Sequence, residues 1–589
     1  MHILIKGGQL TIHSLHMFMQ VLKTLVVWCG AVLVIIMTVI VWRNINSLNI
    51  VSYYDYSLAL FAKKIWGENK RIIVEYDSQR VSKSVKEILN STYFLQNRDK
   101  VNSVVYYGFI TGSRWSLITL LLCIWYFLYQ GYIKSGEHHK RGAEWEKFKA
   151  IRKLIQKANR QYGDQSYSIA GMPYPHLGES KHTLVMGTTG TGKTVTISDL
   201  VEQIRRNGDR AIIYDSKCCY LEWFYDQKKD YILNPFDARG VKWNLLSEIE
   251  HVTQIKSLAQ VFIPQGSGES RIWNEAARIA FTSMLQKLQL QNQNLSNLMI
   301  AENILRQDLK DVAQLVKNTD AQSIIDLTSP KTAASVMFVL ATYLSSLKLY
   351  NTEPSQSFSI RKWLHNDQHD SILFITSQSY LDAELAPLQT TWFEIAISGI
   401  LAQNNNDRKT WVIIDELASL NAIPVLHQGL SRARSYGGCF VLGLQNIAQL
   451  EEVYGQKIAQ DISSECNTRC IFRSNDPNTA KWLADNIGQT ETTEYKEGVS
   501  YGAHAIRDGV SVNKVENIKN LVLPSEILNL KDLCLLLKMT HYSVVKTQIE
   551  YQTRPKLQQP FVPIVTAANL ENEDLIISKT KRKMNNDEI

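Results

Sequence analysis

The chain has 589 residues, of which 45% are apolar and 20% are charged. This length exceeds a single small fold and suits about three or four domains of ordinary size. The composition excludes a largely disordered chain. The net charge of +8 is unevenly placed, because residues 1–133 carry 13 Lys and Arg against 6 Asp and Glu, and the remainder carries 51 against 50. A polyanion held by the larger, nearly neutral part must therefore meet a local stripe or pore of positive charge.

Two uncharged apolar stretches, 24–42 and 115–133, are each long enough to cross a bilayer. A cleaved signal peptide is the alternative for the first stretch. Its apolar run is longer than that of a signal peptide, however, and no small-residue cleavage site follows. We therefore expect residues 1–133 to form a two-span membrane anchor, with a loop over 44–113 and both chain ends on the cytoplasmic side.

The strongest motif is an eight-residue phosphate-binding loop that follows a short apolar strand and precedes a helical pattern. Its glycines allow backbone N–H groups to face phosphate oxygens, and the helix N-terminus adds positive potential. Lys193 is expected to reach the β- and γ-phosphate oxygens, and the Thr194 hydroxyl to ligate Mg²⁺. The residues expected to bind nucleotide are Gly187, Thr188, Thr189, Gly190, Thr191, Gly192, Lys193 and Thr194.

Three further apolar strands end in polar residues. One leads into Asp415 and Glu416, as in a Walker B strand, where Asp415 is expected to hold Mg²⁺ and Glu416 to polarise the attacking water. A later strand ends at Gln445, whose amide either senses the γ-phosphate or lies in solvent. Asp215 ends another strand, and it either touches the nucleotide or caps a loop.

Apolar residues at three- and four-residue spacing dominate 255–352. We interpret this segment as an all-α insertion into an α/β nucleotide-binding domain made of 171–254 and 353–565. The connector over 134–170 has the pattern of a partly exposed helix. Residues 566–589 are expected to form a short disordered tail.

Together these motifs resemble the coupling proteins of type IV secretion and conjugation, of the TraD and TrwB kind. The resemblance runs from the two apolar spans to about residue 560. Besides the phosphate-binding loop it rests on residues 233–237 (LNPFD), 411–419 (WVIIDELAS), 429–434 (GLSRAR) and 443–446 (GLQN). It implies a RecA-like P-loop ATPase with ATP and Mg²⁺, which assembles as a homo-hexamer on the cytoplasmic face of the bacterial inner membrane and moves DNA through a central channel.

The resemblance also implies an arginine that stabilises the γ-phosphate of a neighbouring subunit. The family pattern places this arginine at Arg434, with Arg432 as the second choice. Both could instead form solvated salt bridges at the end of a helix.

The function implied is ATP-driven delivery of relaxase-bound single-stranded DNA, and by extension protein substrates, to a type IV secretion channel. Two alternatives stay open at this point. An FtsK-type pump for double-stranded DNA would be expected to show a long linker and a winged-helix pattern, and neither is seen. A non-hydrolysing, ATP-binding recruitment scaffold is the other. A membrane-anchored metalloprotease is disfavoured, because none of the 13 histidines is followed by glutamate.

Overall fold

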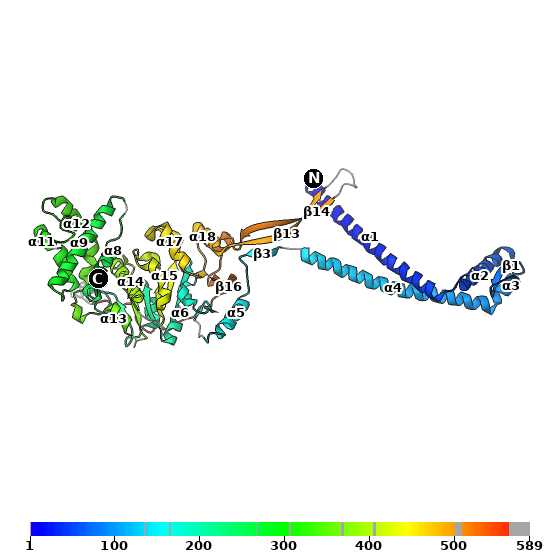
Figure 1. Ribbon diagram of the computed structural model, residues 1–589, viewed down its shortest axis with the longest axis horizontal. Coiled ribbons are helices and arrows are strands. Elements are labelled where there is room, and N and C mark those ends of the chain that lie inside the picture. The colour runs from blue at the N-terminus through cyan, green and yellow to red at the C-terminus, as the bar shows by residue number, and fades with distance from the viewer. Residues whose placement is uncertain are drawn as a thin grey trace, which may run out of the picture. The chain divides into compact units, whose positions relative to one another are not determined.

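The computed structural model describes residues 2–134, 137–163, 167–266, 268–305, 308–366, 370–403, 408–500 and 509–564. The chain divides into two compact units, one made of Met1–His138 with Thr493–Glu516 and the other of His139–Thr492 with Asn517–Ile589 (Figure 1). The tail expected over 566–589 lies outside the described residues.

Two helices of 43 residues each, α1 (His2–Asn44) and α4 (Thr92–Lys134), dominate the first unit. At 1.5 Å per residue each is about 65 Å long, roughly twice the hydrocarbon thickness of a bilayer. By length and composition, Phe18–Asn44 and Thr92–Ile133 could each cross a membrane, and almost none of either segment is buried within the protein. Both apolar segments are longer than the spans expected from the sequence.

Small side chains let α1 and α4 approach closely. A Cβ added at Gly112 would lie 3.1 Å from the carbonyl oxygen of Leu33. One turn further along α4, the Ser116 hydroxyl donates a hydrogen bond to the carbonyl of Cys29 (3.0 Å). Glycine and serine are the residue types that pack helices together inside a bilayer, where the hydrophobic effect between helices is absent.

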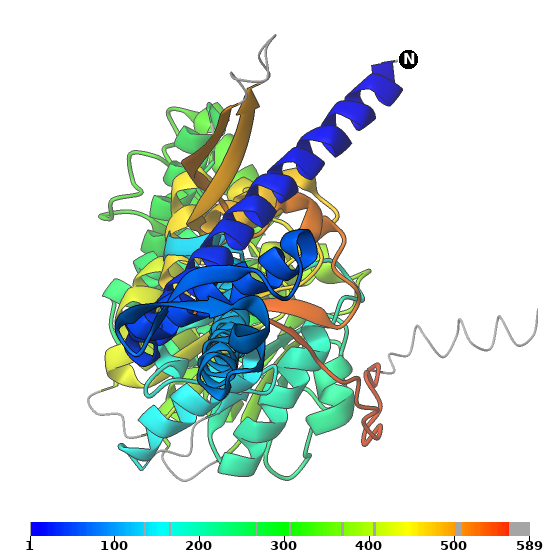
Figure 2. The same ribbon diagram turned by 90° about the vertical axis from the view of Figure 1, so that its right-hand side faces the viewer.

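The segment between the two expected spans, 44–113, contains a folded lobe that precedes the first part of α4. It contains α2 (Ser47–Trp66), β1 (Arg71–Tyr76), β2 (Gln79–Ser84) and α3 (Val85–Asn90). Strands β1 and β2 form an antiparallel hairpin whose two turn residues, Asp77 and Ser78, both have positive φ, which matches the twist of a tight hairpin. The buried core of the lobe comprises Tyr56, Ala59, Val74, Ile88 and Phe94. The lobe lies at the end of the α1–α4 pair and faces the viewer in Figure 2.

The second unit is built on a nine-stranded sheet of order β16-β15-β12-β6-β11-β10-β7-β9-β8. From β12 to β8 all neighbours are parallel, whereas β15 and β16 are antiparallel additions at one edge. The strands are β6 (Thr183–Met186), β7 (Arg210–Asp215), β8 (Tyr231–Leu233), β9 (Ile372–Thr376), β10 (Thr410–Ile414), β11 (Gly438–Leu444), β12 (Thr468–Ile471), β15 (Cys534–Met539) and β16 (Val545–Gln548).

Both faces of this sheet are covered, so its central strands are apolar throughout rather than alternating. Every residue of β6 is buried, with Leu184 and Met186 in one core and Val185 in the core on the opposite face. The covering helices are α5 (Phe148–Arg160), α6 (Lys193–Asn207), α7 (Cys219–Phe224), α13 (Ile360–His365), α14 (Asp382–Leu401), α15 (Leu426–Arg432), α16 (Ile447–Tyr454), α17 (Gln456–Glu465), α18 (Pro477–Ile487) and α19 (Pro524–Leu528).

Between β8 and β9 the chain forms helices, and no strand occurs among the described residues of 245–366. The first five α-helices of this region are α8 (Thr253–Phe262), α9 (Ser270–Gln291), α10 (Asn297–Leu305), α11 (Leu309–Leu315) and α12 (Pro330–Leu344). The segment Pro330–Leu349 also meets the length and hydropathy of a membrane span. One side of α12, however, buries Ala333, Val336 and Leu340 in the core of the second unit.

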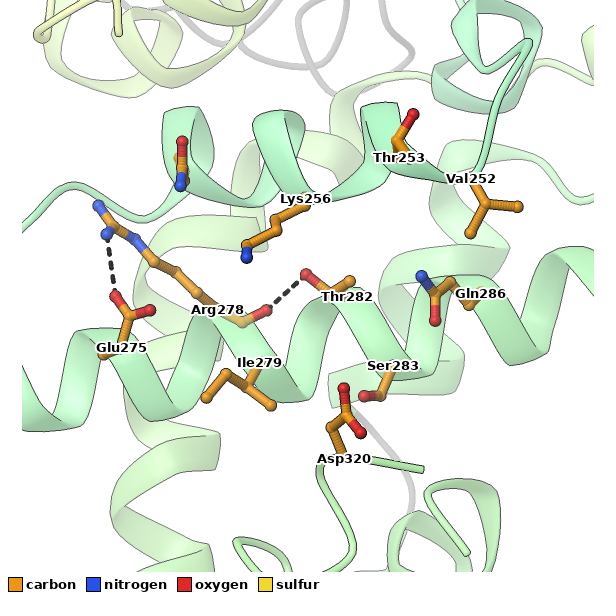
Figure 3. A pocket seen from close by; sticks show the side chains of 11 residues that line it. Val252, Thr253, Lys256, Glu275, Arg278, Ile279, Thr282, Ser283, Gln286 and Asp320 are labelled. Carbon is orange, nitrogen blue, oxygen red and sulfur yellow. Dashed lines mark hydrogen bonds and ion pairs between the residues drawn. The ribbon is translucent and has the colours of Figure 1, made fainter. Parts of the chain in front are cut away.

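A cavity of about 350 Å³ separates α8 from α9 (Figure 3). Two cations, Lys256 and Arg278, and two acids, Glu275 and Asp320, are among the residues that line it. Arg278 is already engaged, because it donates to the carbonyl of Ile263 (2.7 Å) and pairs with Glu275 (3.1 Å). The balanced charge gives this cavity no preference for a phosphate group.

The connector is only partly the helix that the sequence indicated. Helix α5 begins at Phe148, and His138–Gly142 is instead a strand, β3, in a second sheet of order β14-β13-β3 with β13 (Gln489–Ser500) and β14 (Gly509–Asn520). Lys140 and Arg141 both pair with Glu491 on β13, and these ion pairs lower the pKa of Glu491 to about 2. These pairings across the chain outweigh the local helical pattern. A minor hairpin, β4 (Ser168–Ile169) with β5 (Met172–Pro173), follows α5.

Candidate nucleotide-binding site

The phosphate-binding loop joins β6 to α6, and its glycines are required by both conformation and space. Gly190 and Gly192 have backbone φ angles of +82° and +120°, which residues with a side chain rarely adopt. A Cβ on Gly187 would lie 2.5 Å from Cβ of Phe472, and one on Gly192 would lie 3.0 Å from side-chain atoms of Phe472 and Ile549. The Thr191 hydroxyl closes the loop by donating to the carbonyl of Thr188 (2.7 Å).

A cavity of about 230 Å³ lies between this loop and the carboxyl ends of β10 and β11. Strand β11 lies between β6 and β10, so the loop after β6, Asp415 and Glu416 after β10, and Gln445 after β11 meet at one edge of the sheet. The cavity is lined by Thr188, Thr189, Gly190, Gly192, Lys193, Thr194, Val195, Ser216, Lys217, Asp415, Glu416, Gln445, Leu533 and Tyr551. Of the residues expected to bind nucleotide, Gly187 and Thr191 shape the loop without lining the cavity.

Lys193 and Glu416 form the charged centre of the cavity. The Lys193 ammonium lies 3.6 Å from a carboxylate oxygen of Glu416 and donates to the carbonyl of Leu444 (3.2 Å). The amide of Gln445 donates to the same Glu416 oxygen (2.8 Å), so it orients the carboxylate rather than lying free in solvent. Burial lowers the pKa of Lys193 and raises that of Glu416, and their mutual attraction opposes both shifts.

Two carboxylate oxygens in this cavity have no hydrogen-bond partner among the described residues, Oδ1 of Asp415 and Oε1 of Glu416. Burial raises the pKa of Asp415, which the charge of Lys193 partly offsets. Buried, unpaired carboxylate oxygens are costly unless a cation or donor completes the site. A hydroxyl at Thr194 and a carboxylate at Asp415 are the oxygen donors that Mg²⁺ prefers, so the residues present fit a magnesium–nucleotide complex.

Asp215 caps a helix and does not line the cavity. Its carboxylate accepts hydrogen bonds from the backbone N–H groups of Cys219 (3.0 Å) and Leu221 (2.8 Å), at the start of α7. Cys218, at the bend between β7 and α7, has a positive φ of 55°. Full burial raises the pKa of Asp215 to about 7. Of the two roles that the sequence left open, the structure shows the capping role.

Arg432 and Arg434 lie at the junction of α15 with a short 3-10 helix, Ala433–Tyr436, and both are exposed. Neither lines the cavity of its own chain. The junction is tied to the nucleotide-binding core by His182, which precedes β6. Its ring accepts a hydrogen bond from the Phe440 N–H (3.2 Å) and donates to the carbonyl of Leu430 (2.7 Å).

Sequence reasoning did not identify five residues that line the cavity: Val195, Ser216, Lys217, Leu533 and Tyr551. Ser216 and Lys217 directly follow Asp215, so their position after a β-strand could have indicated them. Leu533 and Tyr551 come from the opposite end of the chain, and no local pattern marks them.

The family model for the DNA-binding domain of type IV secretion-system coupling proteins matches residues 166–550, well over half of the chain. The chain belongs to this family. This coupling protein is 29% identical to coupling protein TraD of Escherichia coli strain K12 over 581 residues, which cover 96% of the chain and 80% of TraD. It is 26% identical to conjugal transfer protein TraG of Agrobacterium fabrum strain C58 over 137 residues, 23% of the chain and 20% of TraG.

The coupling protein also matches solved structures of the conjugative coupling protein TrwB. The unbound form, TrwBdeltaN70, aligns with a TM-score of 0.64 and 27% identity, over 73% of this chain and 97% of the solved TrwBdeltaN70 chain. TrwB has also been solved with the ATP analogue ADPNP, and with ADP and Mg²⁺, at the same TM-score and identity. The α/β nucleotide-binding fold of this family is therefore present here.

Proposed function

We propose that this coupling protein hydrolyses ATP to move relaxase-bound single-stranded DNA, and with it protein substrates, towards a type IV secretion channel. The observation that carries the proposal is the cavity itself, where a phosphate-binding loop and Lys193 face two half-buried carboxylates, each with one buried oxygen that has no partner among the described residues. The one-strand separation between β6 and β10 supports a RecA-like core. The complexes of TrwB with ADPNP and with ADP and Mg²⁺ support ATP and magnesium as ligands.

Some residues of the cavity bind the nucleotide, and others act in its hydrolysis. The loop N–H groups and Lys193 hold the phosphates, and Thr194 and Asp415 would hold Mg²⁺, which neutralises phosphate charge when bound. Glu416, held in place by Gln445, polarises the attacking water. Because the exposed Arg434 does not reach its own cavity, it serves a neighbouring subunit of a homo-hexamer, with Arg432 as the alternative.

The two long helices of the first unit support a two-span anchor in the bacterial inner membrane, with the catalytic unit in the cytoplasm. Their apolar segments are exposed and are long enough to cross a bilayer. An anchor also raises the local concentration of subunits, which favours a ring. Family membership supports DNA, the relaxase and channel components as partners.

The test uses the full chain in lipid nanodiscs, with ATP hydrolysis measured without DNA, with single-stranded DNA and with double-stranded DNA. We expect stimulation by single-stranded DNA that is lost in Lys193→Ala. Stimulation by double-stranded DNA alone would instead favour an FtsK-type pump. Nucleotide binding without hydrolysis under every condition would favour the recruitment scaffold and overturn the proposal.

A further inference from the structure

The chain that follows β16 crosses the nucleotide-binding core as an extended segment, which we call the C-terminal strap, residues 549–564. Its main fastening is Arg554, whose largely buried side chain forms an ion pair with Asp199 on α6 and lies 3.5 Å from Glu202. The Leu557 and Gln558 N–H groups both donate to the carbonyl of Glu222 on α7 (3.0 and 3.2 Å). The strap is therefore attached to α6, which follows the phosphate-binding loop, and to α7, which follows β7.

The first residue of the strap, Ile549, is linked to the phosphate-binding loop by hydrogen bonds through Leu533. The Leu533 N–H donates to the carbonyl of Thr191 in the phosphate-binding loop (2.9 Å), and the Ile549 N–H donates to the carbonyl of Leu533 (2.9 Å). The side chain of Ile549 packs closely against Gly192. These contacts fix the strap relative to any bound phosphates.

Two residues beyond Ile549, Tyr551 lines the nucleotide cavity with 67% of its surface exposed. A tyrosine ring is large and amphipathic, and it stabilises a fold mainly when the ring is buried. Because two thirds of Tyr551 is exposed, its ring contributes little to the stability of the fold, although the strap around it is firmly attached. Its only neighbours of apolar character in the cavity lining are Val195 and Leu533. The tyrosine thus provides one aromatic face in a cavity otherwise built for phosphates and metal.

A base bound in this cavity would contact the part of the lining that holds neither phosphates nor metal. Lys193, Glu416 and Gln445 occupy the γ-phosphate end, and Thr194 and Asp415 are the oxygen donors for Mg²⁺. The ribose and base must therefore leave the phosphate-binding loop past the residues that carry neither role, of which Val195, Leu533 and Tyr551 are apolar. Aromatic side chains stack on bases of every kind, because each base has a π-face.

Resting on the proposed nucleotide-hydrolysing function, we propose that Tyr551 stacks on the base of the bound nucleoside triphosphate and that the C-terminal strap is the base-binding element. A base that stacks on Tyr551 between Val195 and Leu533 is contacted on its ring face, and its hydrogen-bonding edge is not contacted. Adenine and guanine are therefore held with similar strength, and selectivity between them is small.

The experiment measures equilibrium binding of fluorescent ribose-labelled ATP and GTP to the full chain in nanodiscs, with unlabelled tripolyphosphate as a competitor that has no base. Tyr551→Ala should raise the Kd for both purine nucleotides roughly tenfold, within the range measured for base–aromatic stacking, and should leave the affinity for tripolyphosphate unchanged. Tyr551→Phe keeps the ring and should restore most of the lost affinity. Tyr162→Ala, at an exposed tyrosine outside the cavity, is the matched control.

Three outcomes would overturn the inference while leaving the proposed function intact: unchanged Kd values in Tyr551→Ala, an equal loss for tripolyphosphate, or a loss for only one purine. Binding is measured without turnover, so a protein that binds nucleotide but does not hydrolyse it still gives a result. If the unaltered chain binds no triphosphate at all, the inference and the proposed function both fall.

Discussion

Lys193 and Glu416 lie 3.6 Å apart in one cavity, yet their substitution should have different consequences. Lys193 offsets phosphate charge in the ground state, so Lys193→Ala should raise the Kd for ATP by about 100-fold or more. In the proposed mechanism Glu416 acts mainly on the attacking water, so Glu416→Gln should bind ATP with nearly normal affinity and lower kcat by about 100-fold. Isothermal titration and a phosphate-release assay separate the two effects. Hydrolysis by Glu416→Gln at the normal rate would remove the assignment of Glu416.

His182 predicts a specific pH dependence of stability. Its burial lowers its pKa to about 4, whereas the unfolded chain binds this proton at its ordinary value near 6.5. The neutral ring therefore stabilises the fold fully above pH 6.5, and up to about 3 kcal/mol of that stability is lost as the pH falls from 6.5 to 4. Denaturant unfolding of the second unit at several pH values measures how steeply the free energy of unfolding changes with pH.

The control for His182 is a substitution that cannot titrate. His182→Gln should lower stability at neutral pH, because one of the two hydrogen bonds is lost, and should flatten the slope between pH 6.5 and 4. Equal slopes for both proteins would show that other groups set the pH dependence.

At the scale of elements, the spacing between β10 and β11 depends on a single glycine. A Cβ on Gly443 in β11 would lie 1.9 Å from the carbonyl oxygen of Asp415. Gly443→Ala must therefore push the two strands apart, which should cost about 1–3 kcal/mol of stability and displace Asp415 and Glu416. Thermal unfolding and magnesium-dependent nucleotide binding should both be impaired. Unchanged magnesium dependence would show that the strand ends move independently of this contact.

The sequence predicts correctly those helices, strands and loops whose pattern lies within a short stretch of the chain. The loop at 187–194 and the strands before Asp215, Asp415 and Gln445 all lie where their patterns placed them. The boundaries of the all-α region remain a prediction, although the described residues there form helices.

The elements that sequence reasoning missed depend on contacts distant in the chain. Strand β3 is held by Glu491, some 350 residues away, against a local helical pattern. The lobe between α1 and α4 has a small core of five buried residues, and its two strands have six residues each, so its local pattern is weak. Tyr551 reaches the cavity only because Leu533 and Ile549 bond its strap to the phosphate-binding loop.

At the scale of the whole molecule, the second unit is expected to assemble weakly without the first. A protein made of residues 134–589, which contains the second unit, is close to neutral and lacks the membrane segments that concentrate subunits. Its ATP hydrolysis should be slow at low concentration and should rise with protein concentration or with added DNA. Analytical ultracentrifugation should show mainly monomer. A stable hexamer at nanomolar concentration without DNA would contradict this expectation.

Hydrolysis across a subunit boundary predicts complementation. Arg434→Ala should keep nucleotide affinity and lose turnover, because transition-state charge then lacks its guanidinium, an effect on the order of 10³-fold. Mixing Arg434→Ala with Lys193→Ala subunits should restore part of the activity, since some interfaces combine an intact loop with an intact arginine. A lack of complementation in mixed rings, with subunit exchange verified, would rule out Arg434 and direct attention to Arg432.

Coupling of ATP hydrolysis to DNA passage is tested most directly during mating, by crosslinking the protein to the transferred strand in donor cells while counting DNA arrival in recipients. In cells that carry only Glu416→Gln, we predict that the protein still contacts the strand but that transfer falls at least about 100-fold, in line with the loss of general-base catalysis. Transfer at the normal frequency in those cells, with the protein crosslinked to DNA, would contradict the claim that this cavity drives DNA movement.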